Sequence, residues 1–172
     1  METKINAAYN IPVKKINRWH VAIAGIVINT SDMQIDMAKL WELREKVKEF
    51  KSTGKKVIIF IDRGSMPLYH FATIADSIVM DPYGTLELSG FVYNRTYMKG
   101  TLEKLGFGFR EIRLFKYKSA NESFSRENFS EGEKEQWERI LQTWYTTIEN
   151  DVCTARHITS QQWKNIIDND VL

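Results

Sequence analysis

Two lysines, Lys116 and Lys118, lie one residue apart in the stretch FKYKSANESF, which is otherwise polar and framed by aromatic residues. A lysine amine acts as a general base only when its pKa falls from about 10.4 toward neutrality, which requires removal from water or a nearby positive charge. Phe115, Tyr117 and Phe124 could exclude water, and Lys116 could add like-charge repulsion. The stretch therefore predicts either a catalytic base at Lys118 or an ordinary lysine in a solvated loop.

The other reactive side chains form no second cluster. Cys153, the single cysteine, falls in the last turns of a helical pattern, where a packed thiol is expected. His70 is expected on the packed side of a short helix, and Asp62 and Asp76 are expected to pair with basic neighbours or caps. The three histidines have no metal-ligand spacing. We therefore predict no metal site and no cofactor.

Alternating strand and helix patterns must position these residues. The apolar runs at 21–29 and 57–61 predict strands buried on both faces. Leucines and other apolar residues at helical spacing predict a helix over 35–50, closed by Gly54, and Pro67 predicts a short helix through residue 75 with Ser65 or Met66 near its N-cap. SIVMDP then predicts a short strand and a turn.

The second half of the chain continues the alternation. LELSGFVYN is expected to be extended, residues 96–105 to form a helix closed by Gly106, and FREIRLF at 109–115 to form a strand. Two capping boxes predict the last helices: Ser130 with Glu133, before a stripe that includes Trp137 and Trp144, and Thr159 with Gln162. These patterns predict one α/β domain over 1–172, with a mostly parallel sheet and helical crossovers. We expect no strand in residues 1–20, which are expected to be poorly ordered.

Composition excludes several classes of protein. The chain has 172 residues, 43% hydrophobic and 27% charged, with a net charge of +2 and no basic stripe, so we expect no nucleic-acid partner. No run approaches the 18 or so apolar residues of a membrane span, and the N-terminus lacks the apolar middle of a signal peptide. We expect the chain itself to be soluble.

Four segments resemble the signal peptide peptidase A (protease IV) family of serine peptidases, which have the Clp-protease/crotonase fold. They are FKSTGKKVIIFID, LYHFATIADSIVMDPYGTLELSGF, YMKGTLEKLGF and FKYKSANESFSRENFSEGEKEQ, in the order and spacing of that family. The resemblance covers about residues 20–170, and YKSA-x-E-x-F is its most specific piece. GFVYN and YMKGTLEKLG resemble the N-terminal half of the long, two-repeat members.

The resemblance implies a serine nucleophile and a lysine general base, and it assigns the lysine to Lys118. Ser119 could orient that amine. The family serine position falls on Met66, a substitution found in N-terminal repeats whose active site is shared with a second repeat. Ser65, one residue earlier, is a possible nucleophile at a helix N-terminus, or a plain N-cap.

The family's Gly-Gly pair, which binds the oxyanion, is missing from this sequence. The corresponding loop reads NTSDMQID, in which Asn29, Thr30 and Ser31 could offer side-chain donors. A turn followed by a helix start is the expected alternative. An isolated chain without the serine and the glycines is expected to be inactive.

These observations predict a lysine-donating module whose serine comes from a second repeat or a homo-oligomer, acting on signal-peptide-like peptides. The family resemblance implies a bacterial cell envelope location, with any membrane association through parts outside this chain. The alternative is a non-catalytic structural or oligomerisation domain that keeps the fold. Acyl-CoA chemistry, known for crotonases, ranks last because it relies on the missing glycines.

Overall fold

The computed structural model describes residues 23–169, which fall into two compact units, the first ending at Leu86 and the second beginning at Glu87. Each unit is described by itself. The expected start of the first strand at residue 21 and the expectation for residues 1–20 lie outside the described residues. The single domain over 1–172 stays a prediction.

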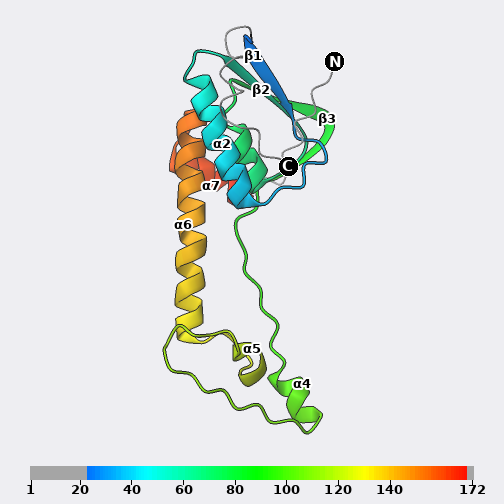
Figure 1. Cartoon of the computed structure of the whole chain (residues 1–172), viewed down its shortest axis with the longest axis vertical. Coiled ribbons are helices and arrows are strands. Elements are labelled where there is room, and N and C mark those ends of the chain that lie inside the picture. The colour runs from blue at the N-terminus through cyan, green and yellow to red at the C-terminus, as the bar shows by residue number, and fades with distance from the viewer. Residues whose placement is uncertain (1–22, 170–172) are drawn as a thin grey trace. The chain divides into compact units, whose positions relative to one another are not determined.

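The first unit is a three-stranded sheet with two helical connections, and it confirms the α/β class. The strands lie in the order β1-β2-β3, and β1 runs parallel to β2 with Gly25 opposite Lys56 and Asn29 opposite Phe60. A helix follows each of the first two strands (Figure 1). The elements are β1 (Gly25–Asn29), α2 (Met37–Lys51), β2 (Lys56–Ser65), α3 (Met66–Ala72) and β3 (Ser77–Glu87).

Both helices of this unit pack on one face of the sheet. Val57, Ile59 and Ile61 of β2 are buried in one cluster with side chains of α2 and α3. Between them Ile58 is exposed, and Val27 of β1 is 69% exposed. The prediction of strands buried on both faces is therefore wrong, because right-handed crossovers between strands in sequential order place successive helices on the same side.

Two strands are longer than predicted. β2 continues to Ser65, so that α3 begins without an intervening loop, and β3 continues through Pro82, where a turn was predicted. Pro82 is tolerated because β3 is the last strand of this sheet, where a missing N–H breaks no interior ladder. A Cβ atom on Gly84 would lie 2.4 Å from the Asp62 carbonyl oxygen, so glycine allows β3 to pass close to β2.

The second unit is built on the long helix α6, against which the segment 88–98 runs in an extended conformation. Tyr93 stacks on Trp137 with ring centroids 3.5 Å apart, and Phe91 meets the edge of Trp144 at 5.8 Å. Alternate residues of the extended segment thus face residues spaced by about two turns of α6. Trp137 and Trp144 therefore hold the extended segment against α6. The helices are α4 (Lys99–Lys104), α5 (Glu122–Ser125), α6 (Glu131–Arg156) and α7 (Ser160–Asn169).

The predicted strand at 109–115 is wrong. This segment has no regular structure, and Ile112 and Leu114 are 82% and 81% exposed, whereas Glu111 and Arg113 turn inward. Alternation makes a strand only where a partner strand supplies hydrogen bonds, and none of the described strands pairs with this segment. The alternating pattern here reflects an inward polar pair and outward apolar residues.

Several predicted helix ends are confirmed, but α3 ends at Ala72 and not at residue 75, and α4 begins at Lys99 and not at residue 96. Gly54 and Gly106 have φ of 81° and 80°, as glycines that close helices do. Thr159 and Gln162 form a complete capping box, in which the Gln162 amide donates to Thr159 Oγ1 at 3.2 Å and the Thr159 amide donates to Gln162 Oε1 at 2.8 Å. At Ser130 and Glu133 only one half forms, because the Glu133 amide donates to Ser130 Oγ at 3.2 Å but the Glu133 carboxylate binds elsewhere.

Candidate active site

Lys118 lies between two backbone turns in the second unit. Its amide donates to the Phe115 carbonyl at 3.1 Å, and the Glu122 amide donates to the Ser119 carbonyl at 3.0 Å. The Lys118 side chain is exposed, and within residues 23–169 its ammonium group makes no ion pair or hydrogen bond. Ser119 Oγ does not bind this amine in the described structure, so the predicted orienting contact is not made here.

Lys116 has different surroundings. Its ammonium lies 2.8 Å from Glu135 Oε2, and the Tyr117 hydroxyl donates to the same oxygen at 3.0 Å. The hydrogen bond to Glu135 raises the pKa of Lys116, so this lysine stays charged. The expected like-charge repulsion on Lys118 is not supported, because Glu135 compensates the charge of Lys116.

The neighbouring aromatic rings do not enclose Lys118. Phe115 is 68% exposed and Tyr117 is 50% exposed, while Phe124 packs against Phe109 with ring centroids 5.4 Å apart. The expectation that these rings exclude water from the amine is therefore wrong for the described chain. The sequence places aromatic residues near Lys118, but the turns direct them elsewhere.

The backbone around Lys118, in contrast, is held firmly. Gln136 Nε2 donates to the Tyr117 carbonyl at 3.1 Å, and Arg95 donates to the carbonyls of Ser119 at 3.0 Å and Ala120 at 2.7 Å. The first turn of α6 also packs closely, since a Cβ atom on Gly132 would lie 2.6 Å from the Lys116 carbonyl oxygen.

Two carboxylates in this part of the second unit are buried, and the first of them supports the turn through Arg95. Glu133 pairs with Arg95 and accepts a hydrogen bond from the Tyr97 hydroxyl at 3.2 Å. Burial, and then the charge of Glu133, raises the pKa of Tyr97 to about 12, so this hydroxyl remains a donor at neutral pH. The second carboxylate, Glu122, pairs with Arg113.

Glu122 stays ionised although its side chain is fully buried. Burial alone would raise the pKa of this carboxyl, but hydrogen bonds from Ser130 and Arg113 outweigh burial and lower it. The Ser130 amide donates to Glu122 Oε2 at 3.3 Å, which replaces the bond that Glu133 would make in a complete capping box. The backbone amide of Ser130 at the start of α6 therefore donates its hydrogen bond to a residue outside the helix.

Ser65 and Met66 lie in the first unit, at the junction of β2 and α3. Ser65 is the exposed N-cap residue of α3, but its side chain makes no capping hydrogen bond. Met66 is buried, so the position that aligns with the family nucleophile contributes to packing. His70 is also buried, and its carbonyl accepts hydrogen bonds from Arg44 and from the Thr73 hydroxyl.

The loop after β1 forms the predicted turn. The Thr30 amide and hydroxyl both donate to the Phe60 carbonyl, at 3.0 and 2.8 Å, and the Ser31 amide donates to Asn29 Oδ1 at 2.9 Å. These donors are therefore engaged within the fold. α2 begins later, where Asp36 caps it by accepting from the Lys39 amide at 2.9 Å.

The remaining candidates have structural surroundings. Asp76 accepts from the Val57 amide at 2.8 Å, which lowers its pKa, and it pairs with Lys51 and Lys56. Asp62 accepts from the Arg63 amide at 2.7 Å. Burial raises the pKa of the Cys153 thiol, as expected for a packed cysteine. No cluster of acidic, histidine or cysteine side chains in residues 23–169 could hold a metal ion.

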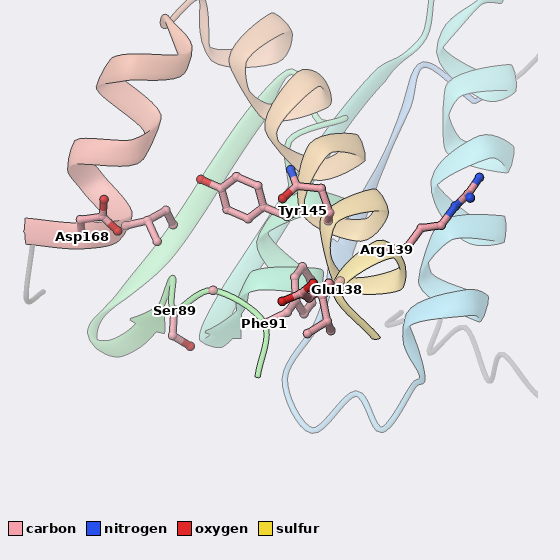
Figure 2. Close-up of a pocket in the computed structure, with 10 residues that line it drawn as sticks. Ser89, Phe91, Glu138, Arg139, Tyr145 and Asp168 are labelled. Atoms are coloured by element: carbon pink, nitrogen blue, oxygen red, sulfur yellow. The ribbon is translucent and has the colours of Figure 1, made fainter. Parts of the chain in front are cut away.

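The second unit also contains an open pocket of about 940 Å³, shown in Figure 2. Its walls come from the segment around Ser89 and Phe91, from α6 with Glu138 and Tyr145, and from the end of α7 with Asp168. Lys118 and its flanking residues do not line it. Its lining includes the Ser89 hydroxyl and the carboxylates of Glu138 and Asp168, and no hydrogen bond described in the structure joins this hydroxyl to either carboxylate.

Sequence reasoning missed the residues that hold the Lys118 turn. Arg95 falls between the stretch predicted to be extended, which ends at Asn94, and the helix predicted from residue 96, whereas Glu133 is predicted only as part of a capping box. One signal was present in the stretch FVYNR, residues 91–95. Phe91, Tyr93 and Arg95 occupy alternate positions there, and alternate residues of an extended chain share one side. The sequence does not show that this side of the segment packs against α6.

The first unit, in which β1 runs parallel to β2 and a helix follows each of the first two strands, has the α/β class that the Clp-protease/crotonase fold requires. The model of peptidase family S49 matches residues 49–172, more than half of the sequence. The chain belongs to this family, the signal peptide peptidase A family of serine peptidases.

Known proteases share this sequence over a limited part of their length. The chain is 30% identical to Protease 4 of Salmonella typhi over 81% of this chain and 23% of that protein. It is 23% identical to "Serine protease SPPA, chloroplastic" of Arabidopsis thaliana over 99% of this chain and 26% of that protein. Protease 4 of Haemophilus influenzae is 29% identical over 79% of this chain and 22% of that protein. The chain thus spans about a quarter of the length of these relatives.

Within residues 23–169, no helix combines the length and the apolar composition that a membrane crossing requires.

Proposed function

We propose that this chain is the lysine-bearing module of a Ser-Lys peptidase, in which Lys118 is the general base and the nucleophilic serine comes from a second repeat or another subunit. The observation that carries the proposal is the contrast within the YKSA turn. The Lys116 ammonium forms an ion pair with Glu135, while the Lys118 ammonium has no partner in the described chain. Family membership and the protease names of the relatives support a peptide substrate.

The proposed reaction uses Lys118 twice. Its neutral amine accepts the proton of the serine hydroxyl while the serine oxygen attacks the peptide carbonyl. The resulting ammonium then gives that proton to the leaving amine as the peptide bond breaks. Water attacks the acyl-enzyme in the same way, and the amine again relays the proton, which releases the carboxylic acid and restores the serine.

Water exclusion around Lys118 must then come from the partner. Exposed apolar side chains lie close to it in sequence, and a partner that covers them would also desolvate the amine. We call this set the apolar flank of Lys118; its members are Leu105, Phe107, Ile112, Leu114 and Phe115. The partner is a second repeat or a second copy of the chain, in keeping with relatives about four times longer.

The substrate proposed is an extended peptide such as a cleaved signal peptide. The proposed location is the bacterial cell envelope, with membrane attachment through parts outside this chain.

The alternative is a structural or assembly domain that keeps the peptidase fold. Burial of Met66 and the engagement of the Thr30 donors favour it. A fluorophosphonate probe tests whether this chain has its own nucleophile. Labelling that disappears in Ser65→Ala would contradict both the alternative and the assignment of the serine to a partner.

The decisive experiment is a peptidase assay on the complete protein that contains this chain. Lys118→Ala is expected to lower kcat by at least a hundredfold, because it removes the general base. Lys116→Ala is the matched control, since it removes an equal charge two residues away, and it should change kcat less than threefold. Equal activity of Lys118→Ala and the parent protein would sink the proposal.

A further inference from the structure

We propose that Arg95 is the positioning residue for Lys118, and this inference rests on the proposed function. Arg95 donates to the carbonyls of Ser119 and Ala120, the two residues that follow Lys118. Arg95 therefore determines where the chain leaves Lys118.

Arg95 is itself held rigidly. Its side chain is 13% exposed, Nε donates to Ser123 Oγ at 2.9 Å, and the guanidinium pairs with Glu133, whose side chain is 1% exposed. A buried ion pair adds little net stability compared with apolar packing of the same volume, but it fixes a geometry. The arrangement is thus better suited to orientation than to stability.

The start of α6 is modified to supply this anchor. In the Thr159 and Gln162 pair the side chain returns to the N-cap amide, as a capping box requires. Glu133 occupies the equivalent position in α6 but directs its carboxylate to Arg95, and Glu122 accepts the Ser130 amide instead. The helix therefore keeps its cap while Glu133 becomes available to Arg95.

The other side of Lys118 is held by α6 as well. Gln136 donates to the Tyr117 carbonyl, and Gly132 brings the helix backbone against the Lys116 carbonyl. The backbone on both sides of Lys118 is thus fastened to one helix while its amine remains free. A displacement of about 1 Å in a catalytic group can cost about a hundredfold in rate, so this fastening matters for a general base.

Arginine is required because its planar fork can bind two carbonyls and a carboxylate together. A lysine at this position could keep the charge pair with Glu133 but could not reproduce the other bonds. Arg113 provides a matched control in the same unit, because its guanidinium contacts the carboxylates of Glu111 and Glu122, which an ammonium can still pair.

The test compares Arg95→Lys with Arg113→Lys by two readouts. In the complete peptidase, Arg95→Lys is expected to lower kcat 10- to 100-fold with KM changed less than twofold. In this chain alone, hydrogen exchange of the Lys118 amide should become at least tenfold faster. Arg113→Lys should change kcat and that exchange rate less than threefold.

An equal loss of kcat in the two variants, or a change confined to KM, would overturn the inference. If Arg95→Lys does not fold, Gln136→Ala removes one bond to the Tyr117 carbonyl and should lower kcat about 3- to 10-fold at unchanged KM. If Lys118→Ala is itself fully active, the proposed function fails. Hydrogen exchange of the Lys118 amide then decides by itself whether Arg95 holds the turn. Unchanged protection of the Lys118 amide in Arg95→Lys would then show that Arg95 does not hold the turn.

Discussion

At the scale of single residues, two lysines with the same local sequence neighbourhood have opposite surroundings. The Lys116 ammonium forms an ion pair with Glu135. The Lys118 side chain has no partner in the described chain, although hydrogen bonds hold the backbone turn that carries it. The difference arises because Glu135 lies on the face of α6 that meets Lys116. Sequence similarity favours Lys118 as the general base, and that assignment stays a proposal.

Glu122 should make the second unit sensitive to acid. Its folded pKa is lowered, so its contribution to stability is present above the unfolded pKa of about 4.3 and is lost as pH falls through the lower folded value. Glu122→Gln should lower the free energy of unfolding by about 1–3 kcal/mol at pH 7. Urea unfolding from pH 7 to pH 2 should show the gap to the parent chain closing as pH falls below about 4.

The control for this prediction is Glu103→Gln, at an exposed position on α4. Its unfolding free energy should stay within about 0.5 kcal/mol of the parent at every pH. A gap between Glu122→Gln and the parent that is the same at pH 7 and pH 2 would contradict the assigned role of the carboxylate.

At the scale of elements, α6 organises the second unit through contacts on successive turns. Trp144 and Trp137 bind the extended segment, Glu133 binds Arg95, and the first turn supports the Lys116 carbonyl. The helix therefore packs through its tryptophans on the extended segment and contacts the candidate site through its first turn. Its amphipathic pattern was visible in the sequence, but the identity of the packed segment was not.

Gly132 allows this close approach, so Gly132→Ala should destabilise the chain. The added methyl group would meet the Lys116 carbonyl oxygen at 2.6 Å, and the strain should exceed the gain in helix propensity. We expect a net loss of about 1–2 kcal/mol, measured by thermal unfolding followed by circular dichroism.

Gly100→Ala is the control, since a methyl group at Gly100, within α4, meets nothing within 4 Å. It should be neutral or stabilising by up to about 1 kcal/mol. Equal effects of the two substitutions would mean that the approach of α6 to the Lys116 carbonyl imposes no steric demand.

At the scale of the whole molecule, the chain carries the proposed base, Lys118, but has the buried Met66 at the position that aligns with the family nucleophile. It matches about a quarter of each of the longer relatives, and its apolar flank of Lys118 is exposed in the described structure. Exposed apolar residues in such number in the stretch that precedes Lys118 in the sequence are typical of a surface that a partner covers. The proposed partner completes both the chemistry and the burial.

Leu114→Glu should weaken that association. A charge placed in an apolar interface must be desolvated without a partner, so the dissociation constant should rise at least tenfold. Analytical ultracentrifugation of this chain tests self-association, and the same measurement with the remainder of the protein tests a second repeat. Tyr83→Glu, which changes an exposed residue of the first unit, should have no effect.

If Leu114→Glu leaves both forms of association unchanged, the apolar flank is not the docking surface. The lysine-bearing module would then have to receive its serine through another part of the chain.

The sequence by itself determined the α/β class and several helix ends, because hydrophobic periodicity, glycine closures and capping pairs act within a few residues. The resemblance of its motifs indicated the family. Only the tertiary structure decided that FREIRLF is not a strand, that Glu133 leaves its capping box for Arg95, and that Glu135 neutralises Lys116. Each of these depends on a partner distant in the chain. Whether a strand pairs, or a buried charge is compensated, is determined by what the fold brings beside it, and local sequence carries no record of that neighbour.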